Sequence, residues 1–388
     1  MVPKAEGDQR VSRLQERLRT QNVDGALFVH PVDLFYFSGT RQNGALWVSA
    51  TGNPLLLIRK SFSRASAESL IADVRPFPRS RELPSLLGNA VRRVGLAFDV
   101  MSLQYHEFYS NLLAGKEFVD ISMINREIRS VKSPWEIDRL RSSGRLLAGV
   151  MSEVPTFLKP GIREIDLAAE IEYRLRRAGN EGPARMRGLG LDVVGLVAAG
   201  VSAASPGCHN GPVTGKGISC ATPFGPSNET IGHDTPIIVD YAAVIEGYSV
   251  DMTRIFVFGD LDRTMKEAFA VSCEILAWIV EHLRPGASCE ELYRHAVDMA
   301  YHAGLGEHFM GYPGEQARFV GHGVGLELDE LPVLAKGMKS PLQAGQTIAL
   351  EPKFIFPGQG VIGIENTYAV TPQGGEKLTP LPDDVVCL

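Results

Sequence analysis

Short apolar runs alternate with charged segments of helical spacing over residues 10–125. The apolar runs have the length and composition of buried strands and lie at 25–29, 45–48, 55–58 and 94–98. Helices are predicted at 61–71, at 104–114 and in a charged segment that carries Leu14 and Leu18 on one face. The alternation predicts an α/β domain over residues 1–130, in which no catalytic constellation stands out.

A strong helix start opens the second predicted domain, residues 131–388. Ser133 is a good N-cap, Pro134 suits the first helical position, and Glu136 completes a capping box. The helix is expected to run to about Leu158 and to end at the segment Lys159-Pro160-Gly161.

The second domain contains an internal repeat. Leu158-Lys159-Pro160-Gly161 recurs 125 residues later as Leu283-Arg284-Pro285-Gly286. The helices that follow are expected to end, at the same offset, at Ala178-Gly179 and Ala303-Gly304. Two markers at one offset favour a duplicated structural unit.

A predicted β-hairpin in the first half of the repeat carries two acids. Asp240 ends an apolar strand, Glu246-Gly247 forms the turn, and the returning strand contains Asp251. Because opposed positions in a hairpin have a constant sum, Asp240 and Asp251 are expected to lie opposite each other about a centre near residue 245 or 246.

The second half repeats this arrangement with Glu351 and Glu365, whose centre at residue 358 falls in the turn segment Pro357–Gly360. Four carboxylates in apolar strands cannot all stay ionised without compensating positive charge. Two divalent cations supply that charge. The alternative is that the acids are exposed and paired with neighbouring Arg or Lys residues, but two facing pairs in matching halves favour metal.

His322 lies in the segment Gly321-His322-Gly323-Val324-Gly325, where three glycines could let the backbone approach a ligand closely. A lone histidine is more often a core residue than a ligand. The glycine frame and the position before Glu351 favour a ligand.

These residues together resemble the creatinase, prolidase and Xaa-Pro aminopeptidase group of metallopeptidases, which have the pita-bread fold. The matching motifs are Asp240, Gly247–Arg254, Gly321–Gly325, Glu351-Pro352 and Ile364-Glu365. The resemblance covers nearly the whole chain. It implies a creatinase-like α/β N-terminal domain and an α+β pita-bread catalytic domain with an internal pseudo-two-fold repeat.

The resemblance also implies the role of each ligand. Asp240 and Asp251 would hold one metal ion, Asp251 and Glu365 would bridge, and His322 with Glu351 would complete the second site. Such an oxygen-rich site admits Mn, Co, Fe or Zn. A hydroxide that bridges the two ions would be the nucleophile, and Glu351 would carry its proton to the leaving group.

The chain departs from the family pattern at Asp329, where the family usually has a histidine. A histidine can donate a hydrogen bond to a substrate carbonyl, whereas an ionised aspartate only accepts. Three explanations stay open: Asp329 is protonated, it is neutralised by a cation such as Lys336 or Lys353, or it meets a cationic group of the substrate. We therefore count Asp329 among the candidate catalytic residues.

Two further positions concern the same site. His209 is the candidate for a second family histidine, because it precedes His322 by 113 residues, close to the 111 that separate Asp240 from Glu351. A loop histidine without a role is the alternative. Gly363 stands where the family often has an arginine.

Composition limits the partners. Against 45 Asp and Glu residues there are 39 Lys and Arg, so the net charge of −6 gives no basic field for a nucleic acid. The five cysteines are scattered without a CxxC pair, which argues against a disulfide framework and favours the cytoplasm. No apolar segment is long enough to predict a membrane span.

The leading hypothesis is a dinuclear metal-dependent hydrolase, an Xaa-Pro aminopeptidase or a prolidase-like dipeptidase. A second hypothesis keeps the metals but gives the enzyme a small non-peptide amide or amine compound as substrate. A binding protein without activity is the third, although such relatives typically lose ligands and this chain retains them. The resemblance further implies a homodimer.

Overall fold

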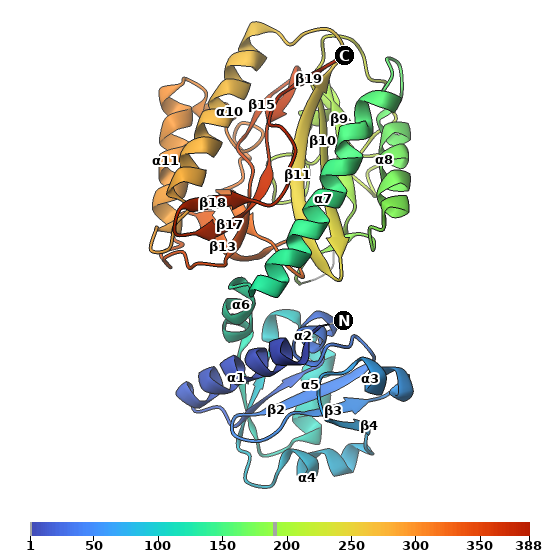
Figure 1. Cartoon of the computed structure of the whole chain (residues 1–388), viewed down its shortest axis with the longest axis vertical. Helices are drawn as coiled ribbons and strands as arrows, with labels where there is room; N and C mark the ends of the chain where they lie inside the picture. Colours follow the sequence, from blue (N-terminus) through green and yellow to red (C-terminus); the bar gives the residue numbers. More distant parts are fainter. Residues whose placement is uncertain (1, 189–191) are drawn as a thin grey trace. The chain divides into compact units, whose positions relative to one another are not determined.

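The computed structural model describes residues 2–188 and 192–388, which divide into two compact units between Arg129 and Ser130 (Figure 1).

The N-terminal unit contains one six-stranded sheet with the strand order β4-β3-β2-β1-β5-β6. Neighbours β1, β2 and β3 are antiparallel, whereas β3–β4, β1–β5 and β5–β6 are parallel. The strands are β1 (Gly25–Phe28), β2 (Gly44–Ser49), β3 (Leu55–Ile58), β4 (Asp73–Pro76), β5 (Arg93–Leu96) and β6 (Glu117–Asp120). The helices are α1 (Lys4–Thr20), α2 (Pro31–Ser38), α3 (Phe62–Glu68), α4 (Leu83–Leu87), α5 (Leu103–Leu112) and α6 (Ser122–Ser130), with short 3₁₀ turns at Ser80–Glu82 and Phe98–Val100.

All four strands predicted in this unit are present. The two that sequence patterning missed, β4 and β6, form the edges of the sheet and contain residues that are half-buried or exposed. Edge strands lack the continuous apolar run that identifies a buried strand, so periodicity alone does not find them.

The predicted start of the long helix is confirmed. Helix α7 runs over Pro134–Phe157, and the side chains of Ser133 and Glu136 form both hydrogen bonds of a capping box. After the link at Lys159-Pro160-Gly161, α8 covers Glu164–Ala178. The second copy consists of α10 (Arg263–His282) and α11 (Cys289–His302), joined by the corresponding link.

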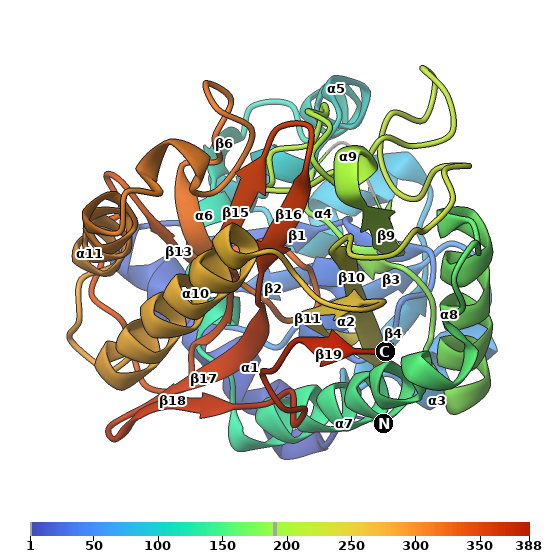
Figure 2. The ribbon, with the colours of Figure 1, turned by 90° about the horizontal axis from the view of Figure 1, so that it is seen from above.

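Two larger sheets and two two-stranded pairs, β15–β16 and β7–β8, lie among these helices in the described residues (Figures 1 and 2). One sheet has the order β19-β11-β10-β9, the other β13-β12-β14-β17-β18, and β15 pairs with β16. The strands are β7 (Ala184–Arg185), β8 (Asp192–Val193), β9 (Gly195–Ala199), β10 (Ile237–Ile245), β11 (Tyr248–Val257), β12 (Phe319–Gly323), β13 (Glu330–Ala335), β14 (Thr347–Leu350), β15 (Lys353–Phe356), β16 (Gly360–Gly363), β17 (Asn366–Thr371), β18 (Gly374–Lys377) and β19 (Val386–Cys387); α9 is Gly200–Ala203 and a 3₁₀ turn covers Gly306–His308. Helix α7 packs on β10 and β11, and α10 and α11 pack near β16, β18 and β13.

The register of the β10–β11 hairpin corrects the prediction for its two acids. Asp240 is opposite Thr253, and Asp251 is opposite Ala242, because a two-residue turn at Glu246-Gly247 moves the centre past the predicted one. Both turn residues have positive φ, 49° and 85°. The two acids are therefore diagonal neighbours, but a shift of two positions leaves their side chains on one face of the sheet.

The register of the second hairpin is confirmed. Lys353 is opposite Gly363 in β15–β16, and the amide of Ile364 donates to the carbonyl of Pro352. This pairing is centred on residue 358, as predicted, and brings Glu351 and Glu365 together just beyond the ends of the paired strands.

Within the described residues, no helix is long and apolar enough to cross a membrane.

Candidate metal centre

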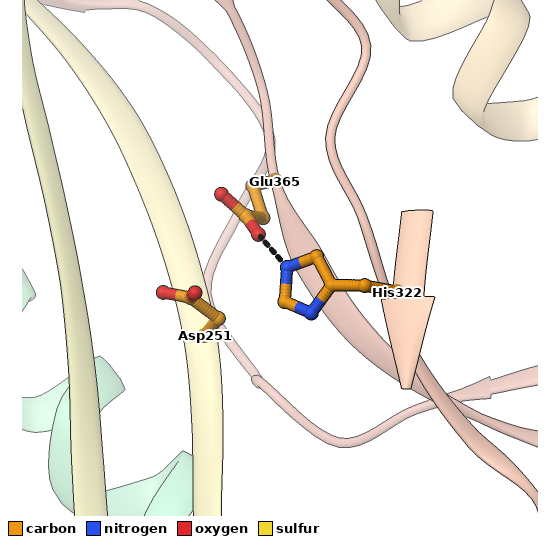
Figure 3. Close-up of side chains that lie close together, drawn as sticks. All are labelled: Asp251, His322 and Glu365. Carbon is orange, nitrogen blue, oxygen red and sulfur yellow. Dashed lines mark ion pairs between the residues drawn. The ribbon is translucent and has the colours of Figure 1, made fainter. Parts of the chain in front are cut away.

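Three of the predicted ligands converge from different strands. Asp251, on β11, His322, on β12, and Glu365, just before β17, each offer one ligand atom, and these atoms lie within 4.8 Å of one another (Figure 3). The carboxylates of Asp251 and Glu365 are buried, and His322 is half-buried. The side chains point toward a common point, which is the arrangement that a metal ion requires.

The two halves of the repeat meet at these ligands. The Thr367 hydroxyl accepts from the amide of Asp251 at 2.9 Å and donates to the Asp251 carbonyl at 3.0 Å. The Thr253 hydroxyl donates to Glu365 Oε2 at 2.9 Å, and the Thr253 amide also pairs with the Glu365 carbonyl. These bonds fix β11 against the segment around residue 365 and so position one acid from each half.

The imidazole of His322 is oriented for coordination. Its Nδ1 lies 3.4 Å from the Gly323 carbonyl, and its Nε2 lies 3.7 Å from Glu351 Oε1 and 3.9 Å from Glu365 Oε1. A proton on Nδ1 leaves the lone pair of Nε2 directed at the acids. Glu351 shares this face because Ala349, two residues before it, is opposite His322 in β12–β14.

The glycines around His322 lie in close contact with neighbouring strands, and the approach of a ligand to this backbone stays a prediction. A Cβ at Gly321 would lie 2.6 Å from the Ala349 carbonyl oxygen, and one at Gly323 would lie 2.4 Å from that of Leu331. The glycines thus allow neighbouring strands to approach β12 closely, and this contact holds the histidine in place.

Lys353 completes the cluster. Its Nζ donates to Asp240 Oδ2 at 2.9 Å, to Glu351 Oε2 at 2.9 Å and to Glu365 Oε2 at 2.7 Å. The sequence suggested Lys353 only as a partner for Asp329, and the structure instead directs it at three of the predicted ligands. The alternative prediction was that the acids are exposed and paired with Arg or Lys residues. The pairing with a lysine is present, but three of the acids are buried.

Burial and crowding shift the pKa values of these groups. Burial raises the pKa of the Asp251 carboxyl well above its usual range, and the charge of Asp240 raises it further. Burial, together with the charge of Asp251, does the same to the pKa of Glu365. For Lys353, burial by itself lowers the pKa, but the three surrounding carboxylates outweigh it and raise that pKa well above its usual range.

Asp329 binds the backbone of a neighbouring segment. Its Oδ1 accepts a hydrogen bond from the backbone amide of Arg187 at 2.7 Å, and the Arg187 guanidinium contacts Glu327 at 3.2 Å. The bond attaches the segment near β7 to the loop between β12 and β13. The catalytic role of Asp329 stays a prediction.

His209 lines a small pocket together with Thr214, Tyr312 and Ile355. Ile355 is two residues from Lys353 on β15, so both side chains point to the same side of that strand. The described residues that line this pocket include none of the predicted metal ligands, so a role of His209 at the cluster stays a prediction.

Sequence reasoning missed the part that Lys353 and Thr253 play in the cluster. The signal for Lys353 was present, because a lysine in the apolar strand Lys353–Phe356 needs a buried partner. Thr253 carried no such signal, since its bond to Glu365 depends on how the two halves pack.

The donor set fits a divalent cation. Oε1 of Glu365 is buried and has no hydrogen-bond partner in the described part of the chain, and it faces His322 Nε2. One imidazole and several carboxylates suit Mn, Co, Fe or Zn. A buried carboxylate oxygen left without a donor is costly, and a bound ion removes that cost.

Comparison with known proteins assigns the chain to a family. Residues 138–372 match metallopeptidase family M24, and residues 10–131 match the creatinase/prolidase N-terminal domain. The chain belongs to metallopeptidase family M24. It is therefore a peptidase-like enzyme of a family that uses divalent metal, and the predicted family and pita-bread fold are confirmed.

Relatives of this M24 chain match it over nearly their full length. An Xaa-Pro dipeptidase of Pyrococcus furiosus is 25% identical over 96% of this chain and 97% of its own. The solved prolidase of Pyrococcus horikoshii has a TM-score of 0.82 at 23% identity, covering 97% of this chain and all of that one. An Xaa-Pro dipeptidase from Bacillus anthracis has a TM-score of 0.85 at 22% identity, covering 98% of this chain and 100% of its own.

Proposed function

We propose that this protein is a metal-dependent, prolidase-like dipeptidase that cleaves the bond before a proline. The observation that carries the proposal is the convergence of Asp251, His322 and Glu365 in a chain of family M24. The Xaa-Pro dipeptidase of Pyrococcus furiosus supports the substrate class, because it matches almost the entire chain.

Asp251, His322 and Glu365 would hold the metal, with Glu351 at its edge. A divalent ion there supplies Lewis acidity and lowers the pKa of water. His322 presents Nε2 to the ion, and the carboxylates of Asp251 and Glu365 that would bind it are buried.

Glu351 is the candidate proton carrier. Its Oε2 is held by Lys353, while its Oε1 faces His322 at 3.7 Å. A carboxylate with one fixed and one available oxygen can take a proton from water and deliver it to the leaving amine without changing position.

His209 is proposed as a substrate-contacting residue. It lines a pocket that contains Ile355, which lies two residues from Lys353 on the same strand. An imidazole there can donate to a carbonyl or carboxylate of the dipeptide. Two divalent ions, a cytoplasmic location and a homodimer remain predictions from the sequence.

The experiment compares Xaa-Pro dipeptides, Xaa-Ala dipeptides and Xaa-Pro-Xaa tripeptides as substrates of protein loaded separately with Mn, Co, Fe or Zn. A prolidase-like enzyme prefers the Xaa-Pro dipeptides. A preference for the tripeptides indicates an aminopeptidase instead, and hydrolysis of none of the three contradicts the proposal.

A further inference from the structure

The ammonium group of Lys353 lies where a cation is expected. It is the donor to one oxygen each of Asp240, Glu351 and Glu365, at 2.7–2.9 Å. Asp251, His322 and Glu365 form a group that could hold an ion, and in the described part of the chain the ion pairs of Lys353 are with Asp240, Glu351 and Glu365.

We propose that Lys353 permanently replaces one of two metal ions, so that the chain binds a single divalent ion between Asp251, His322 and Glu365. The proposal rests on the proposed metal-dependent function and specifies the composition of its site. It departs from the sequence-based expectation of two ions.

The first argument is competition for the same oxygens. Asp240 is the acid that the second ion would need, and its Oδ2 is bonded to Lys353, as is Oε2 of Glu365. An ion would bind these oxygens at about 2.0–2.2 Å, and an ammonium bonded to three acids at 2.7–2.9 Å occupies the space between them where that ion would lie. The ammonium is tethered to the site, whereas an ion must be captured from solution.

The second argument is that Lys353 cannot readily withdraw. Its side chain is 2% exposed, and the neighbouring Phe354 and Ile355 are part of the hydrophobic core. Moving the ammonium away from its three carboxylates would place a charge among apolar side chains, which is strongly unfavourable.

The third argument is that Gly363 leaves room for the side chain of Lys353. Gly363 is directly opposite Lys353, and a Cβ at Gly363 would lie 2.7 Å from Lys353 Cα and 2.8 Å from its Cγ. A side chain at 363 would therefore displace the lysine stem. The glycine and the lysine form a matched pair.

Lys353 also reduces the charge that metal ions must supply. It neutralises one of the four acids, and a single divalent ion neutralises two more, so one ion leaves the site close to neutral.

The test counts ions in the full-length protein after chelation and reconstitution with Mn. Wild-type protein is expected to bind one ion per chain and to give the electron paramagnetic resonance spectrum of an isolated Mn(II) ion. Lys353→Met removes the ammonium at similar length, and it is expected to bind two ions that give a spin-coupled spectrum.

Lys132→Met is the matched control, because Lys132 is equally buried and pairs with Glu330 at 2.9 Å outside the cluster. It should bind one ion. If Lys353→Met does not fold, the wild-type count alone decides.

Two ions in the wild type, or none with any candidate ion, overturn the proposal, as does a Lys353→Met variant that folds and still binds one. Two ions together with Xaa-Pro hydrolysis would overturn this inference but leave the proposed function intact. One bound ion without hydrolysis of any peptide would leave this inference intact but overturn the proposed function.

Discussion

Lys353 and Gly363 are opposite each other across the β15–β16 hairpin, and the missing side chain of the glycine provides the space for the lysine stem. Gly363→Ala is expected to destabilise the fold by about 1–3 kcal/mol, because the new methyl group overlaps the Pro352 carbonyl oxygen, 2.7 Å away, as well as Lys353. Chemical denaturation measures this change. Gly358→Ala is a control for strain alone, since Gly358 has φ 76° and its Cβ would meet no atom within 4 Å. Equal losses in both variants would mean that contact with Lys353 is unimportant.

Glu365 and Glu330 are both buried acids that bind a lysine, but only Glu365 belongs to the metal centre. Glu365→Gln should weaken metal binding at least ~100-fold and abolish activity, because it removes a charged ligand. Glu330→Gln should leave the metal affinity within ~3-fold and mainly lower stability, because Lys132 loses its charged partner. Isothermal titration with the metal distinguishes them, and equal losses of affinity would show that the ligand is misassigned.

The effect of metal on stability should depend on pH. The pKa values of Asp251 and Glu365 are raised in the folded state, so the metal-free folded protein binds more protons than the unfolded protein. The metal-free protein therefore loses stability as the pH rises from about 4, the unfolded pKa, through the folded pKa values. A metal ion binds the ionised carboxylates and offsets this loss. The increase in Tm on adding Mn should therefore be larger at pH 8 than at pH 5.5.

Asp251→Asn provides the check on that trend, because it removes one of the two titrating ligands. In this variant the metal-induced increase in Tm should become small at both pH values. An increase that does not depend on pH in the wild type would mean that these carboxylates do not control metal binding.

The sequence predicts the second hairpin of this site better than the first hairpin or the contacts of Lys353. The centre of the second hairpin could be placed at residue 358 because a proline and glycines mark its turn. The first hairpin was misplaced by two positions because its turn is two residues long, and a period of two still kept both acids on one face. The apolar strand around Lys353 indicates a buried partner, but the identity of its partners could not be predicted, because they lie in both halves of the repeat, on β10 and near β17.

Asp329 is expected to act on local structure. Asp329→Ala removes the acceptor for the Arg187 amide and should cost about 1–3 kcal/mol of stability, whereas Asp329→Asn retains an oxygen and should cost about 1 kcal/mol or less. Denaturation of the two variants checks this. If instead Asp329→His changes kcat/KM for Xaa-Pro peptides relative to other peptides while stability is unchanged, Asp329 contacts the substrate.

The measurement that tests the central claim most directly is the release of proline from an Xaa-Pro dipeptide by chelated and by metal-reconstituted protein, with Glu365→Gln as the variant without a functional metal site. We expect no release after chelation, recovery of activity in proportion to the metal bound, and no recovery in the variant. Release that is unaffected by chelation, or equal release by Glu365→Gln, would contradict the claim that the ion held by Asp251, His322 and Glu365 is required for peptide hydrolysis.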